Sequence, residues 1–377
     1  MTSEGKQGKV RISMQKKYVT GLCVAMAISL GVLGGCGASE EADTEKVTQQ
    51  SQGDRTESDP EKYSSSFIAM GTICSSIVYS TGEDVTEEVT DLLKQIEEEY
   101  ISWRVEGSEI NELNASAGKQ PLQVSAKLAQ MLEDTLDISE KSKGALDPTL
   151  GKIARLWDID GDNPRVPEPQ EITSLLCKDG YKKIQIGEKE TVSLEDEKVS
   201  IDLGAVGKGI GCDEAVEFLK QHKEISGAVI SVGGSIVTYG EKPDGSSWNV
   251  AVNDPEESGE SYLGVLNLTG EHFVSTSGDY EKYFEQDGVR YHHILDPETG
   301  YPAESGLCSV TIITDNGLLS DGLSTACFVL GLEEGKKLVE EYQAEAIFVD
   351  KEEHVYCTDG IKDAFTLMEG NGYQLAE

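Results

Sequence analysis

A regular pattern of apolar and polar positions begins at Phe67 and continues to the end of the chain. It opens with a strand-like run to residue 79 that is interrupted at Gly71, which predicts two strands joined by a turn. Apolar residues then recur at the spacing of an α-helix. The helices that this spacing predicts in the first half of the chain cover residues 85–100, 126–143 and 169–178.

The second half of the chain mixes strand-like runs with helical spacing. Because the two kinds of segment do not alternate strictly, the pattern favours an α+β fold over a parallel βαβ arrangement. No internal repeat interrupts it, so we expect one large domain over residues 67–377. Its predicted strands include residues 227–232, 262–268, 308–314 and 346–349, and its predicted helices cover 213–223, a stretch from about 320, and 333–342.

Residues 1–35 have the pattern of an export signal. Five basic residues and one acidic residue precede an uncharged run over residues 18–39 with an apolar core. The run contains Leu33-Gly34-Gly35-Cys36, the form of a lipobox, in which a peptidase cuts before a cysteine that becomes diacylglyceryl-modified. A plain transmembrane anchor with an incidental cysteine is the alternative. Either interpretation places the protein on the outer face of the cytoplasmic membrane, on the extracellular or periplasmic side.

Residues 36–66 are rich in Ser, Glu, Asp, Gln and Thr, which predicts a solvated acidic tether. The whole chain of 377 residues has 32 Lys and Arg against 69 Asp and Glu, a net charge of −37. Loss of the signal, with its five basic and one acidic residue, leaves 27 − 68 = −41 on 342 residues. This charge disfavours nucleic-acid binding and repels anionic headgroups, so we expect the lipid alone to anchor the protein.

Eight cysteines are present, of which Cys23 lies in the signal and Cys36 is the predicted lipidation site. The other six could pair in an exported protein, or could be buried thiols in apolar segments. No Cys-x-x-Cys pair occurs, which disfavours a zinc site. The six cysteines are at positions 74, 177, 212, 308, 327 and 357.

Three segments concentrate glycine, hydroxyl, carboxylate and histidine side chains in predicted loops. The first, residues 201–209, is glycine-rich and comes just before a predicted helix. Closely spaced glycines let a ligand approach the backbone, a helix N-terminus attracts anions, and Lys208 suits phosphate. A tight connection between a strand and a helix is the commoner explanation of such glycines.

The second segment comprises residues 275–280 and 290–300. Here His292 and His293 stand next to the rigid turn that begins at Asp296. Histidine is the usual proton shuttle near neutral pH, although a histidine doublet alone is more often surface decoration.

The third segment is residues 320–326. If a helix begins here, Asp321, Ser324 and Thr325 face one side of its first turn. A carboxylate with hydroxyls suits a hard cation such as Mg²⁺, whereas a capped helix with a polar first turn is the simpler explanation.

Together and in this order, these segments resemble the ApbE family, the FAD:protein FMN transferases. The resemblance extends from residue 67 to near the C-terminus, and the number of short motifs in one order makes it specific. The residues that carry it are Ala69-Met70-Gly71-Thr72, Ser102-Trp103-Arg104, Ser108 with Leu113-Asn114, residues 144–149, Leu156-Trp157, and residues 202–209, 232–234, 276–280, 293–300 and 321–325.

The resemblance implies a set of site residues. An FAD site would be lined by Met70, Trp103, Ala145, Leu146, Asp147, Asp202, Lys208 and Leu295. Mg²⁺ would be held by the backbone carbonyl of Ala205 together with Asp321 and Thr325. Ser324 occupies a position where some relatives have Asp, so a hydroxyl or a water would serve there.

The implied reaction moves FMN from FAD to a threonine hydroxyl of an exported or membrane redox protein and releases AMP. Mg²⁺ and Lys208 would stabilise the charge that develops on the leaving group. His293 is the candidate base, with Asp296 or Asp321 as alternatives.

Three other functions stay open at this point. With water as the nucleophile, the protein would be a Mg²⁺-dependent FAD pyrophosphatase that yields FMN and AMP. A lipid-anchored flavin- or solute-binding protein without catalysis would share the export signal and the tether. Residues 321–326 also resemble a flavin acceptor sequence, which would make the chain a carrier of covalent FMN.

Overall fold

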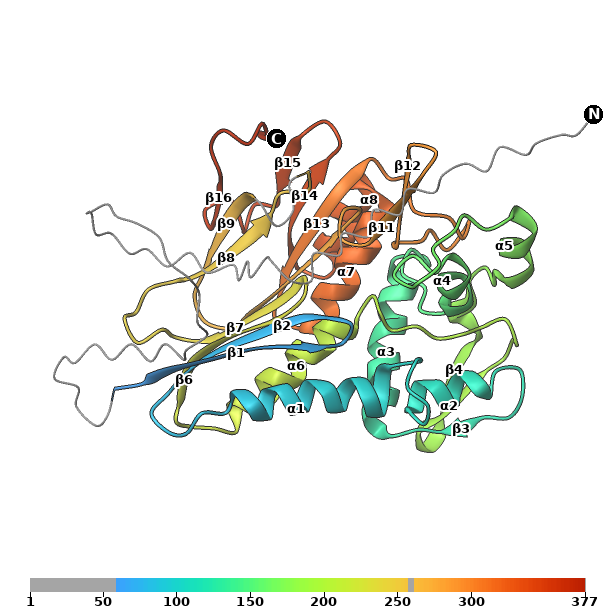
Figure 1. Ribbon diagram of the computed structural model, residues 1–377, viewed down its shortest axis with the longest axis horizontal. Coiled ribbons are helices and arrows are strands. Elements are labelled where there is room, and N and C mark those ends of the chain that lie inside the picture. The colour runs from blue at the N-terminus through green and yellow to red at the C-terminus, as the bar shows by residue number, and fades with distance from the viewer. Residues whose placement is uncertain (1–58, 257–260, 377) are drawn as a thin grey trace, which may run out of the picture.

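The computed structural model describes residues 59–256 and 261–376, so the predicted signal, Cys36 and most of the tether lie outside the described residues. A nine-stranded sheet is its largest feature (Figure 1). Neighbouring strands are antiparallel except the last pair, which is parallel. In sheet order the strands are β1 (Glu61–Ala69), β2 (Thr72–Ser80), β6 (Ile225–Val232), β7 (Ser235–Gly240), β10 (His272–Gly278), β13 (Leu307–Thr314), β14 (Glu345–Asp350), β15 (His354–Cys357) and β17 (Gln374–Ala376).

One face of this sheet is covered by helices. Apolar side chains of α1 and α6 pack against β2 and β6, and those of α7 and α8 pack against β13 and β14. Helix α3 lies against α7. The helices are α1 (Thr86–Ile96), which continues as a π-helical turn at Glu97–Ile101, α3 (Ala126–Lys141), α6 (Gly207–Lys220), α7 (Gly317–Leu330) and α8 (Leu332–Glu341).

A smaller sheet covers part of the other face. Its strands contribute Trp248, Leu263 and Phe365 to an apolar cluster with Ile313 and Val349 of the large sheet. The large sheet is therefore buried on both sides at β13 and β14, whose residues are buried at nearly every position. The strands of the smaller sheet are β8 (Trp248–Asn253), β9 (Tyr262–Leu268) and β16 (Phe365–Leu367).

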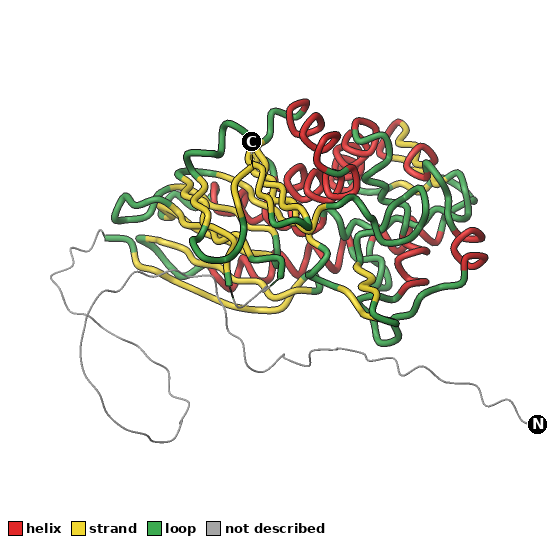
Figure 2. The backbone as a smooth tube through the Cα atoms, turned by 90° about the horizontal axis from the view of Figure 1, so that it is seen from above, coloured by secondary structure: helices red, strands yellow, loops and turns green. Residues whose placement is uncertain are grey.

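Short helices, small sheets and long loops form the other half of the molecule, next to the strand-rich half (Figure 2). Trp157 is the centre of an apolar cluster here: it is fully buried, packs on Tyr291 and Tyr301, and donates a hydrogen bond of 2.8 Å to the Gly300 carbonyl. The elements are α2 (Glu109–Ala115), β3 (Leu122–Gln123), α4 (Gly151–Trp157), α5 (Pro169–Leu175), the 3₁₀ turns Gly180–Lys183 and Glu188–Glu190, β4 (Ile184–Gly187), β5 (Thr191–Leu194), β11 (Tyr283–Gln286) and β12 (Val289–His292).

The predicted α+β class is confirmed, and so is the strand pair with its turn, which falls at Met70 and Gly71. The predicted start of the folded part at residue 67 needs correction, because β1 begins at Glu61. The three consecutive serines at residues 64–66 resemble a tether in composition, yet they pair with β2 along the sheet edge. The predicted tether therefore ends before this strand.

Three predictions about the polar segments of the sequence were wrong in detail. Helix α6 begins at Gly207, so the glycine-rich segment supplies its first turn instead of preceding it. Helix α7 begins at Gly317, because Asn316 caps it by accepting a 2.7 Å hydrogen bond from Leu319 N–H. Residues 275–278 belong to β10, a central strand, and not to a loop.

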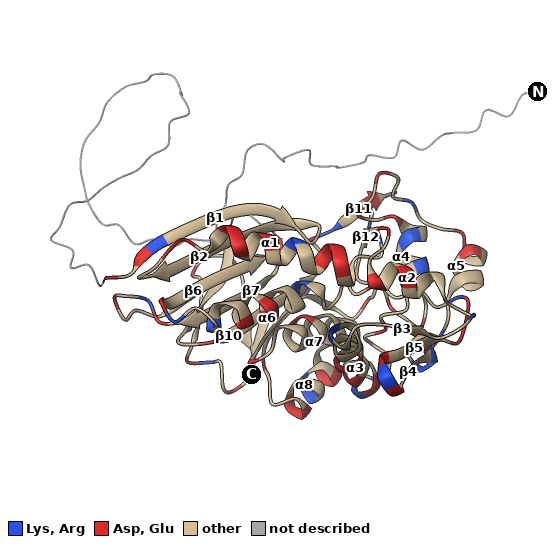
Figure 3. Cartoon of the chain, turned by 90° about the horizontal axis from the view of Figure 1, so that it is seen from below, with Lys and Arg blue, Asp and Glu red and all other residues tan. Residues whose placement is uncertain are grey.

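The six cysteines among the described residues are free thiols, with Cys74, Cys212, Cys308 and Cys327 buried. Within residues 59–256 and 261–376, no helix is long and apolar enough to cross a bilayer. Acidic side chains lie along the outer side of α1, among them Glu87 and Glu88 (Figure 3).

We expect Trp157→Ala to lower the free energy of unfolding by about 3–5 kcal/mol, because it removes a fully buried side chain that joins α4 to the loop after β12. Trp157→Phe keeps most of the ring and loses the hydrogen bond to Gly300, so its cost should be about 1–2 kcal/mol. Urea denaturation of the two variants measures the difference. Equal losses would show that the apolar contacts of Trp157 contribute little.

Candidate active site

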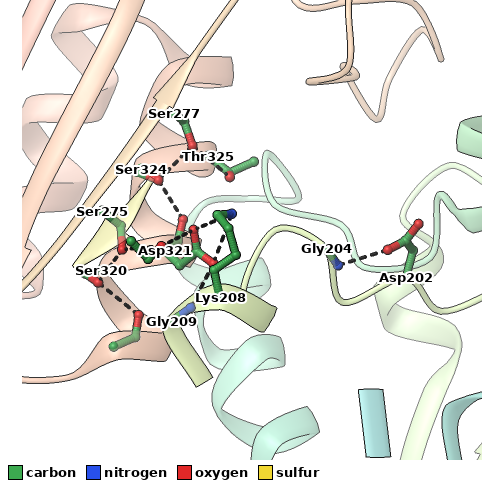
Figure 4. Close-up of polar contacts among 12 residues, drawn as sticks. Asp202, Gly204, Lys208, Gly209, Ser275, Ser277, Ser320, Asp321, Ser324 and Thr325 are labelled. Atoms are coloured by element: carbon green, nitrogen blue, oxygen red, sulfur yellow. Dashed lines mark hydrogen bonds and ion pairs between the residues drawn. The ribbon is translucent and has the colours of Figure 1, made fainter. Parts of the chain in front are cut away.

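An ion pair between Lys208 and Asp321 lies where α6 crosses α7 (Figure 4). Lys208 Nζ is 3.0 Å from Asp321 Oδ1. The Asp321 carboxylate, which is 1% exposed, also accepts hydrogen bonds from Gly209 N–H at 3.1 Å and from Ser235 Oγ at 3.2 Å. A buried carboxylate needs such partners, because burying an unpaired charge is very costly.

The electrostatic surroundings keep Lys208 charged. Burial acts to lower its pKa, but the carboxylates of Asp321 and Glu281 outweigh burial and raise the pKa above its ordinary value. Glu281 follows β10, and its carboxylate lies beside Gly234, where an added Cβ would be 2.9 Å from Oε1. Sequence reasoning missed Glu281, because the motif that pointed to this region ends at Tyr280.

Hydroxyl groups fill the space between Asp321 and the central strands. Ser275 Oγ is 3.0 Å from Ser235 Oγ and 2.8 Å from Ser320 Oγ, which continues the chain of hydrogen bonds from Asp321 into α7. Farther along β10, Ser277 is bonded to both Ser324 and Thr325, at 2.7 and 3.2 Å. These small hydroxyl residues let a strand and a helix approach closely, and each of them has a hydrogen-bond partner.

The four predicted metal ligands have different surroundings. Asp321 and Thr325 lie one turn apart on α7, as the sequence predicted. Ser324 is fully buried, and its hydroxyl donates to the Asp321 carbonyl at 2.8 Å and is bonded to Ser277, so it supports the helix and β10. The Gly209 N–H donates to Asp321 and not to the Ala205 carbonyl, which lies four residues earlier. That carbonyl is therefore available as a ligand.

Trp103 and Asp202 form a second group. Asp202 and Gly204 lie apart from Lys208 in Figure 4. Trp103 Nε1 donates to Asp202 Oδ2 at 2.9 Å, and Asp202 Oδ1 accepts from Gly204 N–H at 2.9 Å. The guanidinium groups of Arg104 and Arg155 lie 4.1 and 4.7 Å from the centre of the Trp103 ring. An aromatic ring with two cations beside it is suited to an anionic, aromatic ligand.

The other predicted FAD residues differ in accessibility. Met70 is half-buried at the turn between β1 and β2, and its sulfur faces Gly211 of α6. Ala145, Leu146 and Asp147 are buried, and Asp147 accepts hydrogen bonds from Thr149 and from the Tyr181 N–H. Leu295 is 9% exposed and packs in the cluster around Trp157.

The two histidines have different surroundings. His292 is buried, its Nε2 lies 3.0 Å from the Ala303 carbonyl, and its ring packs edge-on against Phe328. His293 is half-buried, with Nδ1 3.3 Å from the Lys282 carbonyl. If Nδ1 carries the proton that binds this carbonyl, Nε2 is left as an acceptor.

Asp296 organises the turn after the histidines. Its carboxylate accepts 2.9 Å hydrogen bonds from the Glu298 N–H and from Thr299 Oγ1, and its backbone bonds to Gly300 and Tyr301. Both carboxylate oxygens are therefore occupied within the turn, an arrangement that fits a positioning role better than that of a base.

Comparison with known proteins identifies relatives over most of the chain. The model of the ApbE family matches residues 70–348. A protein of Treponema pallidum named FAD:protein FMN transferase is 35% identical over 328 residues, which cover 82% of this chain and 90% of the relative. One of the same name from Klebsiella pneumoniae is 32% identical and covers 85% of this chain and 99% of the relative.

Solved structures are similar over a comparable extent. The ApbE protein from Thermotoga maritima superposes with a TM-score of 0.74 at 31% identity, covering 81% of this chain and 99% of that chain. The Pseudomonas stutzeri flavinyl transferase ApbE gives 0.70 at 29% identity, covering 81% and 98%. Family model, relatives and fold agree, and the chain belongs to the ApbE family.

Proposed function

We propose that this protein is an FAD:protein FMN transferase, which moves FMN from FAD onto a hydroxyl of another protein and releases AMP. The observation that carries the proposal is the Lys208–Asp321 pair at the crossing of α6 and α7, in a chain whose relatives have that name. The pair supplies a cation and a carboxylate at one place in an otherwise strongly acidic protein.

The surroundings of Trp103 support binding of FAD. Its ring, with Arg104 and Arg155 beside it, offers stacking and positive charge to a flavin or an adenine with its phosphates. Lys208, at the N-terminus of α6, is placed to bind a pyrophosphate oxygen, and the helix N-terminus adds its partial positive charge. Met70, whose sulfur lies against Gly211 of α6, would contact the bound ligand from the β1–β2 turn.

The donor set fits Mg²⁺. No group of three His, Cys, Asp or Glu residues that could bind a metal occurs in the part of the chain that the structure describes. The neighbouring donors are instead oxygens: the Asp321 carboxylate, the Thr325 hydroxyl and the Ala205 carbonyl, the kind of set that a hard cation accepts. Both Asp321 oxygens accept hydrogen bonds in this structure, so a cation there would displace one of them. When bound there, Mg²⁺ would neutralise charge on the pyrophosphate oxygens.

The chemical step is a displacement at phosphorus. The acceptor oxygen forms a bond to the phosphorus of the FMN half, the P–O–P bond breaks, and AMP leaves with the bridging oxygen. The acceptor hydroxyl loses its proton to a base, and Lys208 stabilises the charge that develops on the leaving phosphate.

His293 is the base that the site favours. Burial lowers its pKa to about 3, with Lys282 and Lys208 contributing in the same direction, so the imidazole is neutral at pH 7 but a weak base. The negative charge of a bound pyrophosphate would offset the two lysines and raise the affinity of the imidazole for the proton of the acceptor hydroxyl. Burial also keeps His292 neutral, with a pKa of about 4, but its Nε2 is engaged with Ala303.

The export signal extends the proposal to location and partner. A lipid on Cys36 would hold the enzyme on the outer face of the cytoplasmic membrane, and residues 37–60 would let it reach neighbouring proteins. The acceptor would then be an exported or membrane redox protein that carries FMN on a threonine.

Incubation of the protein with FAD, Mg²⁺ and such an acceptor should leave flavin fluorescence on the acceptor band of a denaturing gel. Chelation of the metal should abolish the transfer, and Asp321→Asn should lower its rate by roughly 10²-fold or more, because the variant loses the charge opposite Lys208. Asp359→Asn, the same exchange at an exposed carboxylate, is the matched control and should leave the rate unchanged.

Free FMN and AMP without labelled acceptor would establish a pyrophosphatase instead. Fluorescence on the protein's own band would show that residues 321–326 are an acceptor, although Ser324 is fully buried. If FAD binding does not change when the metal is chelated and no product forms, the protein is a flavin-binding protein without catalysis.

The free energy of unfolding should fall as the pH drops from 7 to 5. In the unfolded chain His292 and His293 take up protons near pH 6.5, whereas in the folded chain their pKa values are about 4 and 3. At these two positions the unfolded state therefore binds more protons in this range, at a cost to stability of at most about 2 kcal/mol per histidine at pH 5. Asp213, whose folded pKa is raised to about 6, takes up a proton in the folded state and offsets part of this loss. Denaturation of the wild type and of His293→Gln across this pH range measures the change in the free energy of unfolding. A His292 or His293 imidazole that titrates near pH 6.5 by NMR would contradict the prediction.

A further inference from the structure

The two helices that meet at the active site share a short spacing pattern. Gly209 and Asp213 are four residues apart on α6, and Gly317 and Asp321 are four residues apart on α7. A residue and the one four positions later lie on the same side of a helix. Each helix therefore presents a glycine and a carboxylate together, one turn apart.

The two pairs bind each other reciprocally. Asp321 on α7 accepts a hydrogen bond of 3.1 Å from Gly209 N–H in the first turn of α6. Asp213 on α6 accepts bonds of 2.6 Å from Gly317 N–H and 2.8 Å from Leu318 N–H, the first two of α7. Each carboxylate thus satisfies otherwise unpaired N–H groups at the start of the other helix.

The glycines bring the two backbones into contact. A Cβ added to Gly209 would lie 2.0 Å from the Gly317 carbonyl oxygen, and one added to Gly317 would lie 2.2 Å from that of Gly209. Any side chain at either position would push the helices apart and lengthen both sets of hydrogen bonds. We call this arrangement of four residues, Gly209, Asp213, Gly317 and Asp321, the helix clasp.

The two carboxylates of the clasp face different surroundings. Asp321 is paired with Lys208 in the active site. Asp213 lines a cavity of about 390 Å³ between α3, α6 and α7 on the other side of the crossing. Burial, together with Glu214 and Asp134, raises the pKa of Asp213 to about 6, although the two N–H donors act to lower it. No reacting group is assigned to this side, so the reaction itself does not explain why a half-buried carboxylate lies here.

We propose that Asp213 is a positioning residue that fixes the N-terminus of α7 against α6 and thereby holds Asp321 opposite Lys208 and Gly209. This proposal rests on the proposed function, and it names a residue that supports the proposed active site. Loss of Asp213 frees the first turn of α7, and Asp321 one turn later then loses its register with Lys208. Because the group that moves is a proposed metal ligand, the effect should fall on Mg²⁺ dependence and turnover more than on FAD affinity.

The test compares Asp213→Ala and Asp213→Asn with two controls. Asn316→Ala removes the third cap of the same helix end, at Leu319 N–H, without touching α6. Glu217→Ala removes a carboxylate from the same cavity, one turn farther along α6, where it pairs with Lys220. The measurements are the transfer rate, the Mg²⁺ concentration at half-maximal rate, the dissociation constant of FAD, and hydrogen exchange at the Gly209 amide.

For Asp213→Ala we expect turnover to fall and the half-saturating Mg²⁺ concentration to rise, each by roughly tenfold or more, with FAD affinity changed less than about threefold. Exchange at Gly209 should become faster, although Asp213 does not contact that amide. Asp213→Asn keeps one acceptor oxygen and should recover part of each effect. Both controls should stay within about twofold of the wild type in turnover and in exchange at Gly209.

Equal losses in Asp213→Ala and Asn316→Ala would overturn the proposal, because the effect would then be one of helix stability. So would unchanged exchange at Gly209 in Asp213→Ala. If the wild type itself transfers no FMN, the proposed function fails while the clasp is still decided by the exchange at Gly209, which needs no turnover. Should Asp213→Ala fail to fold, the same exchange and turnover measurements on Asp213→Asn decide the proposal.

Discussion

The Lys208–Asp321 ion pair is the interaction on which the rest of the site depends. Asp321 is almost completely buried, and a buried charge of this kind is tolerated only when a counter-charge and hydrogen-bond donors surround it. Those donors come from different parts of the chain: Lys208 and Gly209 from α6, and Ser235 from β7. The pair therefore requires the central strands and both helices to be in place, and the large sheet provides the frame that brings them together.

Because the protein is strongly acidic overall, the positive charge of Lys208 is important for binding an anionic ligand. A chain with a net charge of −37 repels a dinucleotide with its anionic pyrophosphate unless local positive groups compensate. Within the proposed site, positive groups lie at two places, at Lys208 with the first turn of α6, and at Arg104 and Arg155 beside Trp103. They give an anion local positive charge in an otherwise acidic chain.

Sequence patterns predicted the fold class and those elements whose apolar positions repeat clearly, such as β9 over residues 262–268. They failed at β10, because Ser275 and Ser277 resemble loop residues although their hydroxyls are satisfied by partners on β7 and α7. The first turn of α6 was likewise not predicted as helix, because glycines in it resemble a loop. The predicted site residues came from resemblance; Glu281 and Asp213 could not be found, since their roles arise from how two distant segments cross.

The structure also explains how one carboxylate can serve where a second would be expected. The Ser324 hydroxyl donates to the Asp321 carbonyl and is bonded to Ser277, and so it contributes no negative charge to the site. A second carboxylate at this fully buried position would lie beside Asp321 and would add like-charge repulsion to the cost of burial. With a single carboxylate and neutral oxygens, Mg²⁺ would be held weakly by the protein alone. Oxygens of a bound pyrophosphate would then complete its coordination, which ties metal binding to the presence of the substrate.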